Sequence, residues 1–241
     1  MNLIKVKGIV IKEVQFKEND KIITILTDTL GKVSCIAKGA KKVNSPILAN
    51  TQYLVYNEFV LYKSRNFYYI NSATVVDTFY NLRIDLDKLE IAFELTRLLQ
   101  KVTDENEDTS NILKLFLNTL YVLNNLKRDK DLIVSVFKIK LFCLLGFMPH
   151  INKCSSCTKV FDNVDVQTEI YYDYVSNVFL CSDCASSRDK RRLIKINKVT
   201  LIAIEYIMKS DIKKVFNFEL KDIALLRLFA DVYSDTMIGG I

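Results

Sequence analysis

Four cysteines stand in two pairs at a spacing that suits binding of a metal ion. Cys154 and Cys157 form the first pair, and Cys181 and Cys184 form the second. A tight turn lets two thiols two residues apart hold one ion, and two such pairs supply the four sulfurs of a tetrahedral site. We therefore predict one structural Zn²⁺ per chain, held by all four cysteines. Disulfides or four unrelated thiols are the alternatives, and disulfides are less favoured because the first residues contain no apolar export signal.

Other residues that commonly perform catalysis are scarce. His150 is the single histidine of the chain, and a cysteine or serine nucleophile needs a base of this kind beside it. The sequence contains no Gly-rich phosphate-binding loop or dinucleotide fingerprint. A closed site of four thiolates also leaves no open position for water. We therefore expect a protein that is not an enzyme, has no catalytic residue and takes no small-molecule substrate. A nuclease built from converging carboxylates is the weakest hypothesis that we carry.

The elements that must position the cysteines follow from the pattern around them. Between the two pairs, residues 170–175 and 178–180 are β-like runs around Ser176 and Asn177, which predicts a hairpin and hence a zinc ribbon over residues 150–190. Helical periodicity occurs on both sides of it, so we predict that the ribbon is inserted in an all-α domain of residues 81–241. The predicted helices span residues 84–101, 111–126, 131–145, 197–209 and 221–233.

The first third of the chain has the pattern of a small antiparallel barrel. Five runs rich in β-branched and aromatic residues alternate with turn-like segments, at residues 4–14, 21–27, 32–37, 52–62 and 67–77. Gly8 in the first run marks a bulge or a sharp bend. Five short strands in this length fit an oligonucleotide-binding (OB) fold over residues 1–80, with an SH3-like barrel as the competing fold. The predicted class is thus α+β multidomain: a five-stranded OB-fold β-barrel, then an all-α helical domain with an inserted four-cysteine zinc ribbon.

The positive charge is concentrated in the predicted barrel. Residues 1–80 carry 11 Lys and Arg against 6 Asp and Glu, although the chain as a whole carries 34 against 28. A basic domain on a nearly neutral body favours a polyanionic partner, but a solvated lysine surface would give the same charge. The most apolar stretch, residues 132–148, contains Lys138 and Lys140, so we expect a buried helix, no membrane partner and a cytoplasmic protein.

A cluster of lysines follows the third predicted strand, in a loop from which side chains can reach phosphates without entering the core. We predict that DNA is contacted by this cluster, by other basic residues of the barrel and by a basic run after the ribbon. In that order the residues are Lys38, Lys41, Lys42, then Lys12, Lys32 and Arg65, then Arg188, Arg191 and Arg192. For the run after the ribbon, a solvated linker is the competing interpretation. Aromatic residues of the last two strands could stack bases, although most are expected in the core.

The order of these parts resembles the bacterial RecO family of DNA recombination and repair mediators, over essentially the whole chain. The resemblance rests on Gly8–Ile11, Glu18–Ile22, the block Ala37–Lys42 with Ser45 after it, and Leu144–Phe147 ahead of the first cysteine pair. Three residues depart from the family pattern. The family usually has glycine directly after the first pair, where this chain has Thr158, and often has two glycines before the second, where it has Ser176 and Asn177. Glycine would ease a positive backbone angle there.

The resemblance implies an OB fold, a helical domain and a structural zinc ribbon. It further implies binding of single- and double-stranded DNA, annealing of complementary strands, and, together with RecR, assistance in loading RecA onto DNA coated by single-strand-binding protein. Its partners would then be DNA, RecR and single-strand-binding protein, with the RecA filament met indirectly, at the nucleoid in the cytoplasm. By position, Lys38, Lys41 and Lys42 inherit the family's DNA contact. The alternative is a protein-interaction adaptor whose helical domain binds these proteins, with DNA contact incidental.

Overall fold

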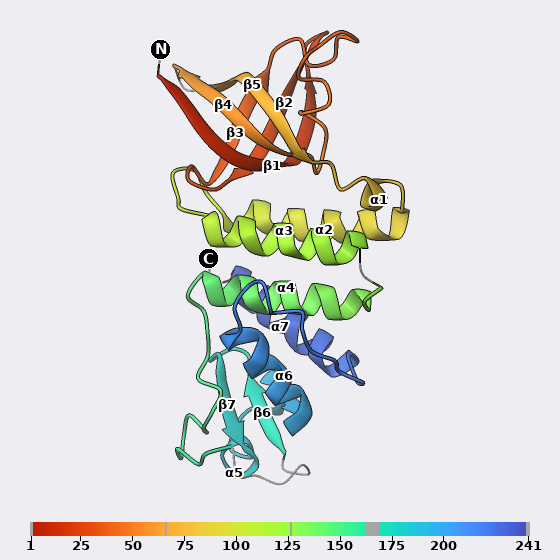
Figure 1. Cartoon of the computed structure of the whole chain (residues 1–241). Helices are drawn as coiled ribbons and strands as arrows, with labels where there is room; N and C mark the ends of the chain where they lie inside the picture. Colours follow the sequence, from red (N-terminus) through yellow and green to blue (C-terminus); the bar gives the residue numbers. More distant parts are fainter. Residues whose placement is uncertain (1, 66, 126, 162–168, 240–241) are drawn as a thin grey trace. The chain divides into compact units, whose positions relative to one another are not determined.

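The computed structural model of the chain describes residues 2–65, 67–125, 127–161 and 169–239 (Figure 1). The chain forms two compact units, Met1–Leu126 and Lys127–Ile241. None of the described helices is long and apolar enough to cross a lipid bilayer. The predicted ribbon includes residues 162–168, and the predicted helix 111–126 ends at residue 126; these positions lie outside the described residues.

The first unit begins with a closed barrel of five strands. They are β1 (Leu3–Phe16), β2 (Asp20–Thr27), β3 (Lys32–Ala37), β4 (Tyr56–Ser64) and β5 (Phe67–Asp77), in the order β1-β2-β3-β5-β4. Neighbouring strands are antiparallel except β3 and β5, which pair in parallel. The prediction of an OB-like five-stranded barrel is thus confirmed. The fourth strand begins later than predicted, because Leu54 has a φ of 63° and cannot continue an extended chain.

The long first strand bends at a point that the sequence did not reveal. The register of β1 against β2 shifts between Val10 and Lys12, so the bulge lies there and not at Gly8. Gly8 is needed for a different reason: a Cβ atom at this position would lie 2.5 Å from the Ile25 Cγ2 atom. Three consecutive residues, Ile9 to Ile11, are fully buried, and because Val10 faces the barrel core, both faces of the strand are covered at this point.

Three helices complete the first unit: α1 (Tyr80–Arg83), α2 (Leu86–Val102) and α3 (Ser110–Asn125). α2 begins after Asp85, whose side chain accepts a hydrogen bond from the Lys88 backbone N–H, so the helix predicted from residue 84 starts slightly later. The connection between α2 and α3 is bound to the barrel, because the buried Thr109 hydroxyl donates to the Thr27 carbonyl at 2.6 Å. These helices were expected within the all-α domain of residues 81–241, but they share a compact unit with the barrel.

The second unit combines helices with a small sheet. Its helices are α4 (Lys130–Leu144), α5 (Ser182–Ala185), α6 (Lys198–Lys209) and α7 (Ala224–Gly239), and a 3-10 turn covers Lys190–Arg192. β6 (Ile170–Asp173) and β7 (Val178–Cys181) form the predicted hairpin. A third strand, β8 (Leu193–Ile196), which the sequence did not predict, follows the basic run and pairs with β6. The ribbon hairpin packs on α7 through its aromatic side chains, with the Tyr172 and Phe229 ring centroids 4.8 Å apart.

The two lysines inside the apolar α4 have partners in the same unit. The Lys140 ammonium donates to the Met208 and Ser210 carbonyls at 2.8 and 2.6 Å, where α6 ends. Lys138 forms an ion pair with Asp231 on α7 at 2.7 Å. These charges belong to the packing of a buried helix, because each ammonium meets acceptors on α7 or at the end of α6 and so is not buried without a partner.

Candidate metal centre and nucleic-acid interface

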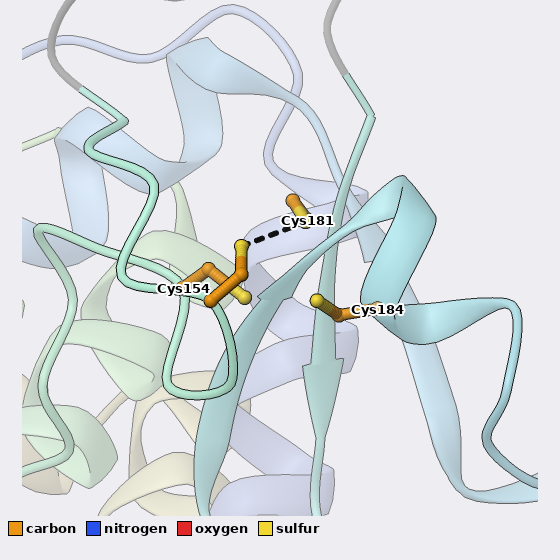
Figure 2. A group of neighbouring side chains, drawn as sticks. Cys154, Cys181 and Cys184 are labelled. Atoms are coloured by element: carbon orange, nitrogen blue, oxygen red, sulfur yellow. Dashed lines mark hydrogen bonds between the residues drawn. The ribbon is translucent and has the colours of Figure 1, made fainter.

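The four predicted metal ligands come together at one end of the ribbon hairpin. Cys154 and Cys157 lie in the loop that precedes the hairpin, Cys181 is the last residue of β7, and Cys184 lies in α5 (Figure 2). All four sulfurs lie within 4.8 Å of one another, and the Cys157 and Cys181 sulfurs are 3.6 Å apart. Sulfurs about 2.3 Å from a tetrahedral zinc lie about 3.8 Å from each other, so the cluster fits such an ion. All four are free thiols.

Backbone hydrogen bonds shape the loop that presents the first cysteine pair. The Cys154 N–H donates to the Lys159 carbonyl at 2.8 Å, and the Thr158 N–H donates back to the Cys154 carbonyl at 3.0 Å. The Ser155 N–H donates to the Phe179 carbonyl at 2.9 Å, which attaches the loop to β7. Thr158 has a φ of 61° and Asn177 a φ of 52°, so two of the three positions where the sequence lacks an expected glycine adopt the left-handed conformation, and Ser176 does not.

The electrostatics of the cluster favour a cation. Burial raises the pKa of the Cys154 thiol, but N–H groups of Cys157, Cys181 and Ser156 outweigh this effect and lower the pKa to about 6. The adjacent thiols of Cys157 and Cys181 raise the pKa of Cys184 to about 12. The thiolate form is therefore favoured at Cys154 and disfavoured at Cys184. A bound divalent ion would stabilise the thiolate form of both, because it binds thiolates.

The predicted lysine loop is held against the turn between β1 and β2. The Lys41 N–H donates to the Asn19 carbonyl at 3.0 Å, and the Gly39 N–H donates to the Asp20 carboxylate at 2.8 Å. Lys38 and Lys42 are exposed, whereas Lys41 is half-buried. The loop thus has a defined backbone from which two lysine side chains reach solvent.

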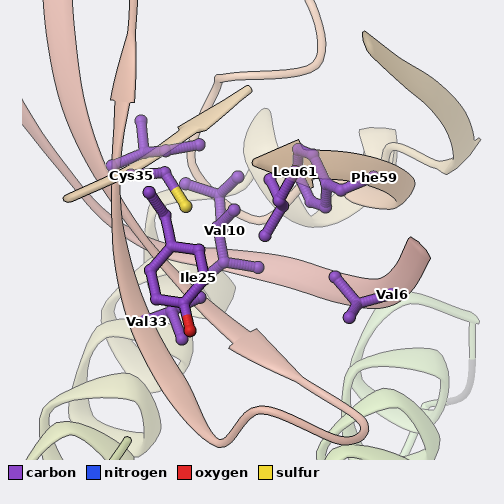
Figure 3. Packing of buried hydrophobic residues seen from close by; sticks show 9 residues of the cluster. Val6, Val10, Ile25, Val33, Cys35, Phe59 and Leu61 are labelled. Atoms are coloured by element: carbon purple, nitrogen blue, oxygen red, sulfur yellow. The ribbon is translucent and has the colours of Figure 1, made fainter. Parts of the chain in front are cut away.

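An aromatic pair lies beside this loop on the outer surface of the barrel. Tyr62 on β4 and Tyr69 on β5 are register partners, and their rings stack with centroids 5.2 Å apart and planes at 14°. Both are half-buried, and the Lys38 ammonium lies 4.9 Å from the Tyr69 ring centroid. By contrast, Phe59 and Tyr68 are in the barrel core, where Figure 3 shows Phe59 among aliphatic side chains. The alternation along β4 and β5 therefore divides the aromatics between core and surface.

The other basic residues predicted in the barrel occupy different places. Arg65 is exposed in the turn that joins β4 and β5. Lys12 is exposed on β1, directly after the bulge. Lys32 is half-buried, and its ammonium donates to the Gln100 carbonyl of α2 at 2.6 Å. That ammonium is used within the unit, whereas the side chains of Lys38 and Lys42 face solvent.

The three arginines that follow the ribbon differ in the same way. The Arg192 guanidinium donates to the fully buried Asp173 carboxylate at 3.0 Å and to the Ser176 hydroxyl at 2.8 Å. Arg191 is exposed and pairs with Asp189 at 2.9 Å. Arg188 is exposed and forms no ion pair with another residue in the described part of the chain. Arg192 thus stabilises the hairpin turn, and Arg188 is the most available of the three.

Sequence reasoning missed two features of these sites. Asn177 had been regarded only as a replacement for glycine, but its amide donates to the Phe147 carbonyl at 3.0 Å and its carbonyl accepts from the Tyr172 hydroxyl at 2.8 Å. Phe93 follows the period of the helix predicted over residues 84–101, yet 47% of it is exposed. The contacts that decide both positions come from distant parts of the chain, so no local signal identified them.

Comparison with known proteins agrees with these parts. The family described as Recombination protein O N terminal matches residues 1–79, and the family described as Recombination protein O C terminal matches residues 83–231. The DNA repair protein RecO of Acetivibrio thermocellus is 40% identical over 93% of this chain and 87% of its own length. The proteins of the same name from Caldicellulosiruptor saccharolyticus and Alkaliphilus metalliredigens are 32% and 30% identical, over 89% and 88% of this chain and 84% of their own length in each case.

Proposed function

Because the chain belongs to the RecO family of DNA repair proteins, we propose that it binds single- and double-stranded DNA and anneals complementary strands. The observation that carries this proposal is the exposed Lys38 beside the stacked Tyr62 and Tyr69. Lysines at a barrel surface bind phosphates and release counterions, and aromatic rings stack bases of any sequence. Annealing would follow because bound cations reduce the repulsion between two strands that are brought together.

We further propose that the protein acts as a mediator, without catalysis, in the cytoplasm at the nucleoid. Together with RecR it would assist the loading of RecA onto DNA coated by single-strand-binding protein. The barrel, residues 1–80, would be the DNA-binding domain, and the later helices would supply surfaces for the protein partners. Val199 and Ile202 on α6 are exposed apolar side chains at helical spacing, which supports a contact with protein there. The same observation favours the second candidate, an adaptor with incidental DNA contact.

We assign the cysteine cluster to one structural Zn²⁺, with Cys154, Cys157, Cys181 and Cys184 as its ligands. A bound zinc would cross-link the loop before the hairpin to β7 and α5, and four thiolates would leave it no open position for a substrate. The remainder of the ribbon would then be held by its own contacts, through the aromatic side chains on α7 and through Arg192 at the hairpin turn.

Annealing of two complementary labelled oligonucleotides tests this function directly. We expect the wild-type protein to accelerate annealing, and the double variant Lys38→Glu with Lys42→Glu to lose at least about tenfold in rate, because both cations at the phosphate contacts become anions. The matched control is Lys101→Glu with Lys114→Glu, which makes the same change of charge on exposed residues of α2 and α3.

Two outcomes would contradict the proposal in different ways. Annealing by the lysine variant at the wild-type rate would show that the site lies elsewhere. No acceleration by the wild-type protein, together with capture of RecR or single-strand-binding protein from nuclease-treated lysate by both the wild type and the lysine variant, would favour the adaptor.

A further inference from the structure

A groove of about 550 Å³ lies between β1 and α2 in the first unit. Lys12 lines it from β1, Tyr53 from the connection before β4, and Phe93 and Arg97 from α2. Its two walls are joined by a hydrogen bond from the Gln100 amide to the Ile11 carbonyl at 3.2 Å, and Lys32 on β3 also ties the barrel to the Gln100 carbonyl. The groove is thus a fixed feature of this unit.

An aromatic stack forms part of the groove wall. The Tyr53 and Phe93 rings are 4.6 Å apart between centroids, with planes at 11°. The Tyr53 hydroxyl is 2.7 Å from the Thr96 hydroxyl, which holds the Tyr53 ring in place. Because Tyr53 covers one face of Phe93 while 47% of Phe93 is exposed, the other side of the ring is open to a ligand. Such a supported ring is a stacking platform for a flat group.

The charges around this platform suit an anionic ligand. Lys12 and Arg97 are both exposed at the groove. A second hollow of about 370 Å³ adjoins it, shares Glu13 and Tyr53, and adds Lys21 and Arg83 to the lining. The Glu13 carboxylate is held by Lys21 at 3.0 Å, so the one acidic side chain of the lining is already paired.

The second hollow leads toward the lysine loop. Lys21 is the register partner of Ala37, the residue directly before Lys38. The loop of Lys38 to Lys42 is attached to the neighbouring turn between β1 and β2 by the hydrogen bond from the Lys41 N–H to the Asn19 carbonyl. Basic residues therefore stand at both ends of this path, Lys38 on the loop and Lys12 and Arg97 at the groove, with the Lys21–Glu13 ion pair between them.

We propose that this groove is a subsite for single-stranded nucleic acid, in which one base stacks on Phe93 and the flanking phosphates meet Lys12 and Arg97. The inference rests on the proposed DNA-binding function and extends its path beyond the loop of Lys38 and Lys42. A paired base inside a duplex cannot present its face to a ring, so the subsite selects single strands. The outer surface of the barrel would then bind both single- and double-stranded DNA, and the groove would bind single-stranded DNA alone.

The test compares Phe93→Leu with Tyr121→Leu, which alters a similarly exposed aromatic residue on α3. We expect Phe93→Leu to weaken binding of oligothymidylate about tenfold in fluorescence anisotropy, because base stacking on an aromatic ring contributes on that scale, and to leave duplex affinity unchanged. Tyr121→Leu should change neither. Arg97→Ala should reduce the slope of log affinity against log salt by about 0.7, the loss of one phosphate contact, and Lys101→Ala should not.

Photocrosslinking of an oligonucleotide with 5-iodouracil to the wild-type protein provides an independent readout. A crosslinked peptide that contains Phe93 or Tyr53 supports the subsite. Crosslinks confined to the segment of Lys38 to Lys42, with unchanged affinity of Phe93→Leu, would overturn the subsite and leave the proposed DNA binding intact. Failure of the wild-type protein to bind oligothymidylate at all would overturn both.

Discussion

The Lys38 ammonium lies 4.9 Å from the centroid of the Tyr69 ring, which itself stacks on Tyr62 at 5.2 Å. The lysine chain is thereby held over an aromatic pair on the outside of the barrel. A cation fixed in this way stands next to a surface on which a base can stack, so one nucleotide could meet both groups at once.

Lys38 and Tyr69 should therefore be coupled in DNA binding. We expect Lys38→Ala and Tyr69→Leu each to weaken binding of single-stranded DNA several-fold, and the double variant to lose less than the sum of the two in free energy, because each removal also displaces the other group. Anisotropy titrations of the four proteins measure this cycle. Additive losses would show that the two side chains act separately.

Lys32 should matter for stability and not for DNA. Its ammonium donates to the Gln100 carbonyl at 2.6 Å, so Lys32→Met removes a charged hydrogen bond between the barrel and α2. We expect the free energy of unfolding to fall by about 1–3 kcal/mol in urea titrations. Oligonucleotide affinity should stay at the wild-type value, with Lys114→Met on α3 as the control for loss of one charge. A large loss of affinity with unchanged stability would return Lys32 to the binding surface.

Metal removal should affect the second unit selectively. We expect one zinc per chain in native mass spectrometry, and its loss to a chelator or in Cys184→Ser should unfold the ribbon, because binding energy at such sites is folding energy. Acidification should release the metal as protons compete for the thiolates. Cys143→Ser, outside the cluster, should retain it. A chain with no metal, or full zinc content in Cys184→Ser, would contradict the assignment of ligands.

Thr158 and Asn177 have similar backbone angles but should respond oppositely to glycine. Thr158 has a φ of 61°, and a β-branched residue in that conformation costs about 1–2 kcal/mol, so Thr158→Gly should stabilise the metal loop and slow zinc transfer to a chelator. Asn177→Gly relieves the same angle but loses the hydrogen bonds to the Phe147 carbonyl and the Tyr172 hydroxyl. It should lower the melting temperature. Equal behaviour of the two variants would show that backbone strain alone decides.

In the basic run after the ribbon, Arg192 should contribute to stability and Arg188 to DNA binding. Arg192→Ala leaves the buried Asp173 carboxylate without its guanidinium, which we expect to destabilise the second unit by about 2–4 kcal/mol in thermal unfolding. Arg188→Ala should leave the melting temperature unchanged and reduce the salt dependence of DNA binding if the run contacts phosphates. Loss of stability in Arg188→Ala would contradict the exposed position of its side chain.

Much of the architecture was predictable because its signals are local. Alternation along the strands predicted the barrel, helical period predicted the helices, and the spacing within each cysteine pair is itself a turn geometry. β8 was not predicted, because its four residues are too few to show an alternating pattern and its partner, β6, lies about twenty residues earlier in the chain. The bulge between Val10 and Lys12 was not predicted, because it is defined by the pairing of β1 with β2 and not by the sequence of β1 alone.

By itself, the sequence determined three properties: the spacing of the four clustered cysteines in two groups of two, the small barrel, and the excess of positive charge in the first eighty residues. Composition and short-range spacing are sufficient to specify each of them. The tertiary structure alone decided which charges are available. Lys32 begins β3 and Lys38 directly follows it, six residues later. The Lys32 ammonium nevertheless donates to the Gln100 carbonyl, sixty-eight residues away, whereas the Lys38 ammonium lies over the Tyr69 ring. Likewise Phe93 became a surface ring because Tyr53, from a distant loop, occupies only one of its faces. Which side chains face a ligand depends on such long-range contacts, and no local pattern encodes them.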